Sequence, residues 1–381
     1  MAGYAGYAGY AGYAGYAGYA GYAGYAGYAG LGGLASAMGD PFLSQALLRS
    51  RDGTFQEVGS QQANWQAQWS PVKRWAGDAA TPPTALPACD QPAQLAWWEA
   101  HIRGFLCEFE LLSQFKFESP AAETYKLSHI GGQPIVTIKR PTRDIFEQQL
   151  PLVESWATRR EDRIPEISTQ MLPQIPFWTS ICNLHPQRTP KTLELIEIAL
   201  RITMIVVMRF KHALACPRPV EYSPNIQPIL LTPGYSALPS GHATESHMVA
   251  RLLQELMGQN ANSPLSAQMQ GVAARITDNR VAAGLHFPVD NVSGRLLGDT
   301  LAGFFVTLCT GGASATWKSR TFTGTGFPPA QDWDPTETLD PNPATAYIGS
   351  ADTAQVDVTA LAPMLKWLWT QARTEQTNSG F

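Results

Sequence analysis

The chain has 381 residues, of which 44% are hydrophobic and 15% are charged, and its formal net charge is −4. A chain of this length and apolar content can bury a full hydrophobic core in one large domain with tails. The slightly acidic balance argues against a general nucleic-acid-binding protein. The five cysteines are odd in number and lack C-x-x-C spacing, so neither a zinc site nor a disulfide framework is indicated.

The first 34 residues form a low-complexity repeat, because Ala-Gly-Tyr occurs nine times in succession between Ala2 and Tyr28. Glycine at every third position without proline does not favour a collagen triple helix. Such a segment is typical of a flexible tail, but stacking of its tyrosines makes self-association through the repeat an alternative prediction. Residues 35–91, rich in Gln, Ala and Pro, are predicted to form an extended arm or linker.

Residues 92–311 are predicted to form a helical domain. Its first helix is expected near residues 97–117, a short β-hairpin follows around Gly131 and Gly132, and helices resume near Asp144. After Gly312 prolines recur, which predicts a loop-rich C-terminal extension over residues 312–381 with a final helix near 361–373. The predicted fold is therefore a mostly α-helical bundle with a small β-hairpin and irregular terminal extensions.

The sequence shows neither a secretory signal nor a membrane span. The N-terminus lacks a basic region followed by an apolar core. The longest apolar stretches are interrupted by charged residues such as Arg201 and Asp299. We therefore expect a cytoplasmic protein without a transmembrane segment.

Three predicted helices turn basic side chains toward the interior. Lys211 lies one turn after Val207 on the apolar face of one helix, and Arg280 lies four residues after Ile276 on another. His242 precedes the apolar stripe of a third helix by one heptad, again on its buried side. Because a buried cation without a partner is costly, these side chains predict a bound or buried anion.

The same residues belong to three motifs, Lys211-x6-Arg218-Pro219, Pro239-Ser240-Gly241-His242 and Arg280-x5-His286-x3-Asp290. One lysine and two arginines supply fixed positive charge, and a serine hydroxyl and a glycine N–H supply neutral donors. Two histidines can divide the roles of nucleophile and proton donor between them. The set predicts an enzyme with a site for a tetrahedral oxyanion.

The local context of each histidine indicates its place at the anion. Ser240 fits the N-cap of the helix that follows it, so the first N–H groups of that helix face the anion and His242 lies beside it. Pro288 fits the first position of the next helix, which places His286 outside a positive helix end that favours a neutral, nucleophilic imidazole. Asp290, four residues later, can accept the proton of one ring nitrogen and leave the other facing the ligand.

The three motifs, in this order, resemble the signature of the superfamily that joins type 2 phosphatidic acid phosphatases, bacterial class A acid phosphatases and vanadium-dependent haloperoxidases. The likeness covers about residues 92–311, and the runs 239–245 and 279–290 are especially similar to soluble bacterial members on the haloperoxidase side. For the phosphatases, the resemblance implies an all-α bundle in which His286 forms a phosphohistidine and His242 protonates the leaving group. The residues that it implies as holding the phosphate oxygens are Lys211, Arg218, Ser240, Gly241 and Arg280.

The haloperoxidases of this superfamily hold vanadate in the same pocket, on the residue that matches His286, and use hydrogen peroxide and a halide. The resemblance thus implies vanadate as cofactor, with His286 as its ligand, for a haloperoxidase, and no cofactor for a phosphatase. Asn279 stands where the phosphatases usually have serine, which is expected to weaken only a peripheral contact. Tyr235, seven residues before His242, matches a position relevant to halide choice, and a tyrosine there decides neither function.

Three functions remain as alternatives. The first is a hydrolase of phosphomonoesters or pyrophosphates, the second is a haloperoxidase, and the third is a self-assembling structural protein whose site only binds phosphate. The complete set of two histidines, Asp290 and three cations argues against the third. The interval of 44 residues between His242 and His286 is similar to that of the phosphatases, whereas the amino-acid sequence of the motifs is closer to that of the haloperoxidases. We favour the hydrolase, with a small-molecule phosphate ester as its substrate.

Overall fold

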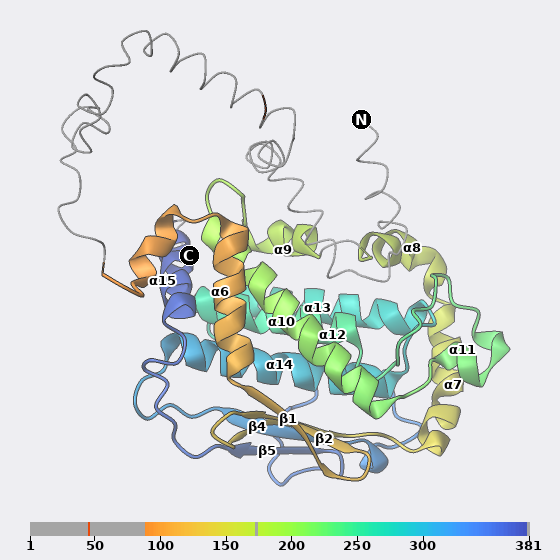
Figure 1. Ribbon diagram of the computed structural model, residues 1–381. Helices are drawn as coiled ribbons and strands as arrows, with labels where there is room; N and C mark the ends of the chain where they lie inside the picture. Colours follow the sequence, from red (N-terminus) through yellow and green to blue (C-terminus); the bar gives the residue numbers. More distant parts are fainter. Residues whose placement is uncertain (1–44, 46–87, 172–173, 379–381) are drawn as a thin grey trace, which may run out of the picture. The chain divides into compact units, whose positions relative to one another are not determined.

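The structure of the protein, a computed structural model, describes residue 45 and residues 88–171 and 174–378. The Ala-Gly-Tyr repeat and almost all of the predicted arm lie outside these residues. Figure 1 shows that the elements after residue 92 form a helical layer over a β-sheet. In chain order these elements are η2 (Pro92–Trp97), α6 (Ala100–Ser113), β1 (Phe115–Ala121), β2 (Thr124–His129), β3 (Pro134–Lys139), α7 (Arg143–Ala157), α8 (Arg160–Thr169), α9 (Ile175–Cys182), α10 (Pro190–Leu214), α11 (Pro219–Tyr222), η3 (Pro224–Ile226), α12 (Gly241–Leu256), α13 (Pro264–Ala282), α14 (Pro288–Thr310), β4 (Lys318–Thr323), η4 (Gly324–Gly326), β5 (Ile348–Asp352) and α15 (Pro363–Asn378).

The prediction of an all-α fold is wrong, because the described chain contains a five-stranded mixed sheet with the order β1-β2-β3-β4-β5. The predicted hairpin exists as β2 and β3, but β1 extends it on one side. On the other side β3 pairs in parallel with β4, with Ile138 opposite Phe322, and β4 pairs antiparallel with β5. The segment after residue 312 is therefore not an irregular extension, since it contributes two strands and the final helix α15.

Helix α14 connects the sheet to the helical layer. Its Phe304 ring packs edge-on against Trp317, with centroids 4.9 Å apart, and lies 5.8 Å from the ring of Phe115 at the start of β1. Aromatic pairs of this kind each contribute about 0.5–1.5 kcal/mol beyond the burial of their surface. Arg320 of β4 adds a buried ion pair with Asp299 of α14, at 2.6 Å. These contacts hold α14 against the sheet, and His286, the predicted nucleophile, directly precedes this helix.

In the described part of the chain, α14 alone has the length and apolar composition of a membrane-spanning helix, with a mean hydropathy of 1.2 over an 18-residue window. However, 72% of that window is buried inside the structure. Protein therefore already covers most of its apolar surface, as is usual for a core helix.

Two glycines of α14 allow α12 to approach it closely. A Cβ atom on Gly294 would lie 2.6 Å from the carbonyl oxygen of Ser240, and one on Gly298 would lie 2.3 Å from that of Thr244. Neither distance is compatible with a side chain. The Ser240 N–H also donates to the carbonyl oxygen of Asp290, at 2.9 Å. These contacts hold the start of α12 against the start of α14, which brings two of the three motifs together.

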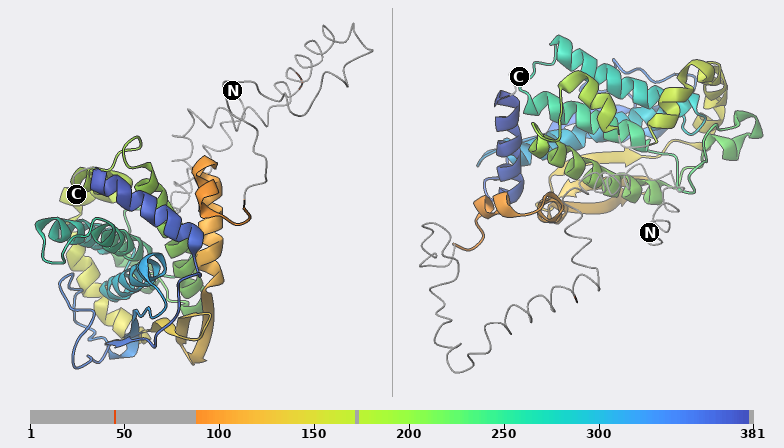
Figure 2. Two further views of the ribbon diagram at one scale, coloured as in Figure 1. Left: turned by 90° about the vertical axis from the view of Figure 1, so that its left-hand side faces the viewer. Right: turned by 90° about the horizontal axis from the view of Figure 1, so that it is seen from above.

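The helix ends that carry the motifs follow from local sequence. Pro190, Pro219, Pro264 and Pro288 each occupy the first position of a helix, where the missing N–H costs nothing. Figure 2 shows that α15 crosses one end of the helical layer, where it packs on α10 and α6. The opposite end of α10, which carries Lys211, is left for the site.

Candidate active site

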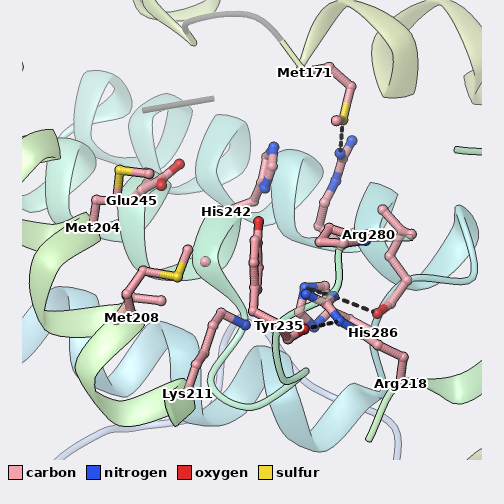
Figure 3. Close-up of a pocket in the computed structure, with 14 residues that line it drawn as sticks. Met171, Met204, Met208, Lys211, Arg218, Tyr235, His242, Glu245, Arg280 and His286 are labelled. Carbon is pink, nitrogen blue, oxygen red and sulfur yellow. Dashed lines mark hydrogen bonds between the residues drawn. The ribbon is translucent and has the colours of Figure 1, made fainter. Parts of the chain in front are cut away.

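The three motifs meet at one small cavity with a volume of about 40 Å³, which is room for more than one water molecule. Figure 3 shows that basic side chains and methionines both line it, with Met171 beside Arg280. The residues that line the cavity are Met171, Met204, Val207, Met208, Lys211, Arg218, Pro233, Tyr235, Gly241, His242, Glu245, Arg280, Leu285 and His286.

The predicted residues reach this cavity from the ends of five helices. Charged side chains can point inward there because helix ends leave main-chain N–H and carbonyl groups without intrahelical partners. Lys211 lies in the last turn of α10, Arg218 precedes α11, Gly241 and His242 begin α12, Arg280 lies in the last turn of α13, and His286 precedes α14.

The two cations of the first motif are buried against main-chain carbonyls. Lys211 is 1% exposed, and its Nζ donates to two carbonyl oxygens of the loop before α12, at 2.5 and 2.8 Å. Arg218 is 2% exposed, and its Nε and Nη1 donate to two further carbonyl oxygens, at 3.0 and 2.9 Å. Burial lowers the pKa of the Lys211 ammonium well below its usual value, and the charge of Arg218 lowers it further. Both cations would therefore gain from a bound anion.

The third cation, Arg280, is fully buried and incompletely hydrogen-bonded. Its Nη2 donates to the side-chain oxygen of Gln170 at 2.9 Å, and its Nη1 lies 3.7 Å from the sulfur of Met171. Its Nε has no partner among the residues that the structure describes. Burial lowers the pKa of this guanidinium to about 10. A buried donor without an acceptor indicates a place for a ligand oxygen.

None of these three cations forms an ion pair with a carboxylate within 4.0 Å in residues 88–171 and 174–378. Other buried arginines of this part of the chain do have such partners, for example Arg103 with Glu194 at 2.6 Å. The site therefore concentrates positive charge that the protein itself leaves only partly neutralised. A tetrahedral oxyanion would supply the missing negative charge and acceptors.

His286 is held in one tautomer by its two neighbours. Its Nδ1 lies 3.1 Å from the Asp290 oxygen that also accepts from the main-chain N–H of Phe287, so Nδ1 carries the proton. Its Nε2 lies 3.0 Å from Nη1 of Arg218, which can only donate, so Nε2 keeps its lone pair. Burial and the nearby cations, first Arg218 and then Lys211, hold the pKa of this imidazole well below its usual value. The ring is therefore neutral and presents an unprotonated nitrogen to the cavity.

Asp290 lies behind His286 and does not line the cavity. One of its oxygens accepts both from His286 and from the main-chain N–H of Phe287, the latter at 2.9 Å, while the other has no described partner. Ser240 is also buried and outside the lining, and its hydroxyl has no partner in the described chain. It occupies the predicted N-cap position, but its side chain does not cap the helix.

His242 directs its ring away from His286. Its Nε2 lies 3.1 Å from the main-chain carbonyl oxygen of Gln170, which fixes the proton on Nε2. Burial, followed by the charge of Arg280, lowers the pKa of His242 to about 3. Its other nitrogen is consequently an acceptor in this structure.

Tyr235 lies between two of the cations. Its ring centroid is 5.5 Å from Nζ of Lys211 and 5.3 Å from Cζ of Arg218, which are cation–π distances. The face of this ring thus adds to the stabilisation of both charges. Whether it affects the choice of halide or substrate stays a prediction.

Several residues of the site were not predicted from the sequence. Glu245 lines the cavity three residues after His242, and this helical spacing is the signal that could have identified it. Met171 and Gln170 come from the end of α8 and carry no recognisable pattern. Asn279 is less peripheral than expected, because its amide donates to the same Gln170 oxygen that accepts from Arg280, at 3.0 Å.

Comparison with known families agrees with the motifs. The family model of the PAP2 superfamily matches residues 195–315, about a third of the chain, and this range contains every residue that we predicted for the site. No curated protein matches the chain at a significant level. The matched range extends from α10 through α14, the helices whose ends surround the cavity. This match supports membership of the chain in the PAP2 superfamily, whose members are typically phosphatases or haloperoxidases.

Proposed function

We propose that the protein is a phosphohydrolase that cleaves small phosphate monoesters or pyrophosphates through a phosphohistidine on His286. The observation that carries this proposal is the set of three buried cations that have no carboxylate partner in the described part of the chain, beside an unprotonated imidazole nitrogen. The cations supply electrostatic stabilisation where negative charge develops, and the imidazole supplies the nucleophile.

The proposed reaction begins when a phosphate ester binds with its oxygens toward Lys211, Arg218, Arg280 and the first N–H groups of α12. Arg218 then transfers its hydrogen bond from His286 Nε2 to a phosphate oxygen, which frees the lone pair. Nε2 attacks phosphorus, the bond from phosphorus to the ester oxygen breaks, and the departing oxygen leaves as an alcohol with a proton taken up from solvent. Asp290 accepts from Nδ1 and stabilises the positive charge that develops on the ring. Water then cleaves the nitrogen–phosphorus bond and releases phosphate.

The cavity wall favours hydrolysis over halide oxidation. Met171, Met204 and Met208 line the cavity, so their thioethers lie beside any product formed there. Hypohalous acid and peroxide convert methionine to its sulfoxide, which is polar and disrupts packing. A hydrolase releases nothing that attacks these side chains.

Haloperoxidase activity is the second candidate, because the same residues fit vanadate. Vanadate is a tetrahedral oxyanion like phosphate, so the three cations would hold its oxygens and His286 Nε2 would be its protein ligand. When bound, it would supply activation of hydrogen peroxide toward a halide. The contacts of Tyr235 with Lys211 and Arg218 would place an aromatic ring close to that centre.

Trapping of the intermediate tests the proposed function. Wild-type protein mixed with phosphate ester labelled at phosphorus and quenched in alkali, in which phosphohistidine is stable, should retain label. His286→Ala should retain none and release no phosphate, because the nucleophile is gone. His212→Ala, which removes an exposed histidine of the same α10 region, is the control and should label normally. Label on His286→Ala, or halide oxidation by vanadate-loaded protein without any phosphate release, would refute the hydrolase.

A further inference from the structure

Gln170, the residue that directly follows α8, contacts two side chains that line the cavity. Its side-chain oxygen accepts from Nη2 of Arg280 at 2.9 Å, and its main-chain oxygen accepts from Nε2 of His242 at 3.1 Å. Gln170 itself is fully buried and does not line the cavity. A residue in such a place can control the orientation of its neighbours without touching a ligand.

The side-chain amide of Gln170 is fixed with its oxygen toward Arg280. A guanidinium group can only donate, so it must face the amide oxygen and not the amide NH₂. The same oxygen accepts from the side chain of Asn279 at 3.0 Å. Asn279 is held in turn, because its oxygen accepts from Arg163 and its NH₂ also donates to Glu166, both at 3.0 Å. The position of the Gln170 oxygen is therefore determined from outside the cavity.

This acceptor is neutral, unlike the acceptor of a buried arginine elsewhere in the fold. Arg320 of β4 forms an ion pair with Asp299 at 2.6 Å, so the protein itself neutralises that charge. A carboxylate in the place of the Gln170 amide would neutralise Arg280 in the same way. The amide instead accepts the hydrogen bond and leaves the full positive charge of Arg280 for an anion.

The hydrogen bonds of Arg280 are concentrated on the side of α8. Its Nη2 also donates to the main-chain oxygen of Ile167 at 3.4 Å. Its Nη1 meets only the sulfur of Met171, a weak acceptor 3.7 Å away at the cavity wall, as Figure 3 shows. Its Nε has no partner in the described part of the chain. One end of the guanidinium is thus anchored, and the Nε–H is left for a ligand oxygen.

We propose that Gln170 is a positioning residue of the oxyanion site. Its neutral side-chain oxygen holds Nη2 of Arg280, and this hydrogen bond keeps the Nε–H and the uncompensated charge of the guanidinium available to the phosphate group of the substrate. The proposal rests on the proposed phosphohydrolase function, because phosphate is the anion that Arg280 would bind.

Gln170→Glu tests the requirement for a neutral acceptor. The variant keeps the shape of the side chain and the oxygen that accepts from Arg280 and Asn279. The replaced Nε2 has no described partner, so the change breaks no described hydrogen bond. A unit charge added several Å from a bound anion, in a partly polar interior, should weaken the binding of inorganic phosphate about 10- to 100-fold. Calorimetric titration of the full chain at neutral pH measures this Kd.

Gln114→Glu is the matched control. Gln114 is also buried and also directly follows a helix, α6, and its side-chain oxygen lies 3.3 Å from Nε2 of His129. It does not line the cavity, so this variant adds the same charge and should leave the Kd of phosphate unchanged. A wild-type Kd in Gln170→Glu, or an equal weakening in Gln114→Glu, would overturn the proposal.

Gln170→Met decides the question if Gln170→Glu does not unfold cooperatively. Methionine keeps the length of the side chain but removes the strong acceptor for Arg280. The measurement is the Nε–H signal of Arg280 in ¹H–¹⁵N spectra, identified by its absence in Arg280→Lys. Phosphate should shift this proton downfield in wild type, because Nε–H gains an acceptor, and the shift should be lost in Gln170→Met. A merely structural role would lower stability but keep the shift in the folded protein, and a retained shift would therefore refute the positioning role.

Failure of the proposed function gives a different result. Wild-type protein that neither binds phosphate nor releases it from an ester refutes the hydrolase, and with it the site that Gln170 would serve. Wild-type protein that binds phosphate, with Gln170→Glu binding it equally well, refutes only the role of Gln170.

Discussion

Replacement of Asp290 by asparagine should cost this protein far less activity than the same change costs enzymes in which an aspartate orients a catalytic histidine. In a serine-protease triad the change lowers kcat about 10⁴-fold, because the amide reverses the tautomer of the histidine. In this structure one oxygen of Asp290 accepts from both His286 Nδ1, at 3.1 Å, and the Phe287 N–H, at 2.9 Å. An asparagine oxygen in that position keeps both hydrogen bonds.

The asparagine NH₂ group would then take the place of the second oxygen, which already lacks a described partner. The His286 tautomer is therefore retained, and only the negative charge is lost. A hydrogen bond to a charged group is worth about 1 to 1.5 kcal/mol more than a neutral one, which corresponds to roughly a tenfold loss of kcat. Asp290→Ala, in contrast, leaves two buried donors without an acceptor and should lose activity about as severely as a triad variant, near 10⁴-fold.

The assay is steady-state hydrolysis of 4-nitrophenyl phosphate, with the ¹⁵N chemical shifts of His286 as an independent reading of the tautomer. Asp290→Asn should keep the proton on Nδ1 and should bind phosphate at least as well as wild type, since a nearby negative charge has been removed. A loss of 10³-fold or more in Asp290→Asn, or a proton that has moved to Nε2, would refute the reasoning from the shared oxygen.

Two further predictions concern the anion site and the helix packing that supports it. Phosphate at one hundred times its Kd should stabilise the wild type against thermal unfolding by about 2.7 kcal/mol. This gain should vanish in Arg280→Met but persist in Arg275→Met, which removes an exposed arginine of the same helix that is paired with Glu166. Equal gains in both variants would show that Arg280 does not bind the anion. Gly298→Ala should destabilise the protein by at least about 1 to 3 kcal/mol through overpacking, because its Cβ would lie 2.3 Å from the Thr244 carbonyl oxygen. A Cβ on Gly303 of the same helix meets nothing within 4 Å, so Gly303→Ala should be neutral or stabilising by about 0.5–1 kcal/mol. Chemical denaturation measures the free energy of unfolding of both variants.

The convergence of the motifs could be predicted because it depends on short-range geometry. Lys211 lies one turn after the last apolar residue on the inward face of α10, and Arg280 lies one turn after the corresponding residue of α13. Helical periodicity alone therefore directs both side chains inward. Pro288 marks the start of α14 and thereby places His286 just before a helix. Each of these inferences needs only a few neighbouring residues.

The sheet could not be predicted in the same way, because its central pairing joins distant segments. β3 and β4 pair in parallel although almost 180 residues separate Ile138 from Lys318. In β4 the two buried positions are Arg320 and Phe322, so a charged residue interrupts the alternation that identifies a strand. The arginine is buried only because Asp299 of α14 and Asp340 neutralise it, and neither partner is visible from the strand itself.

Inside the site, the contacts of Gln170 likewise could not be predicted from the sequence. Its side-chain oxygen accepts from Arg280 and Asn279, and its main-chain oxygen accepts from His242. A neutral amide more than seventy residues before His242 forms no motif with it, yet these hydrogen bonds decide which nitrogen of His242 carries its proton. The motif therefore identifies His242 as part of the site, but the proton-donating role inferred from resemblance depends on a residue outside the motif.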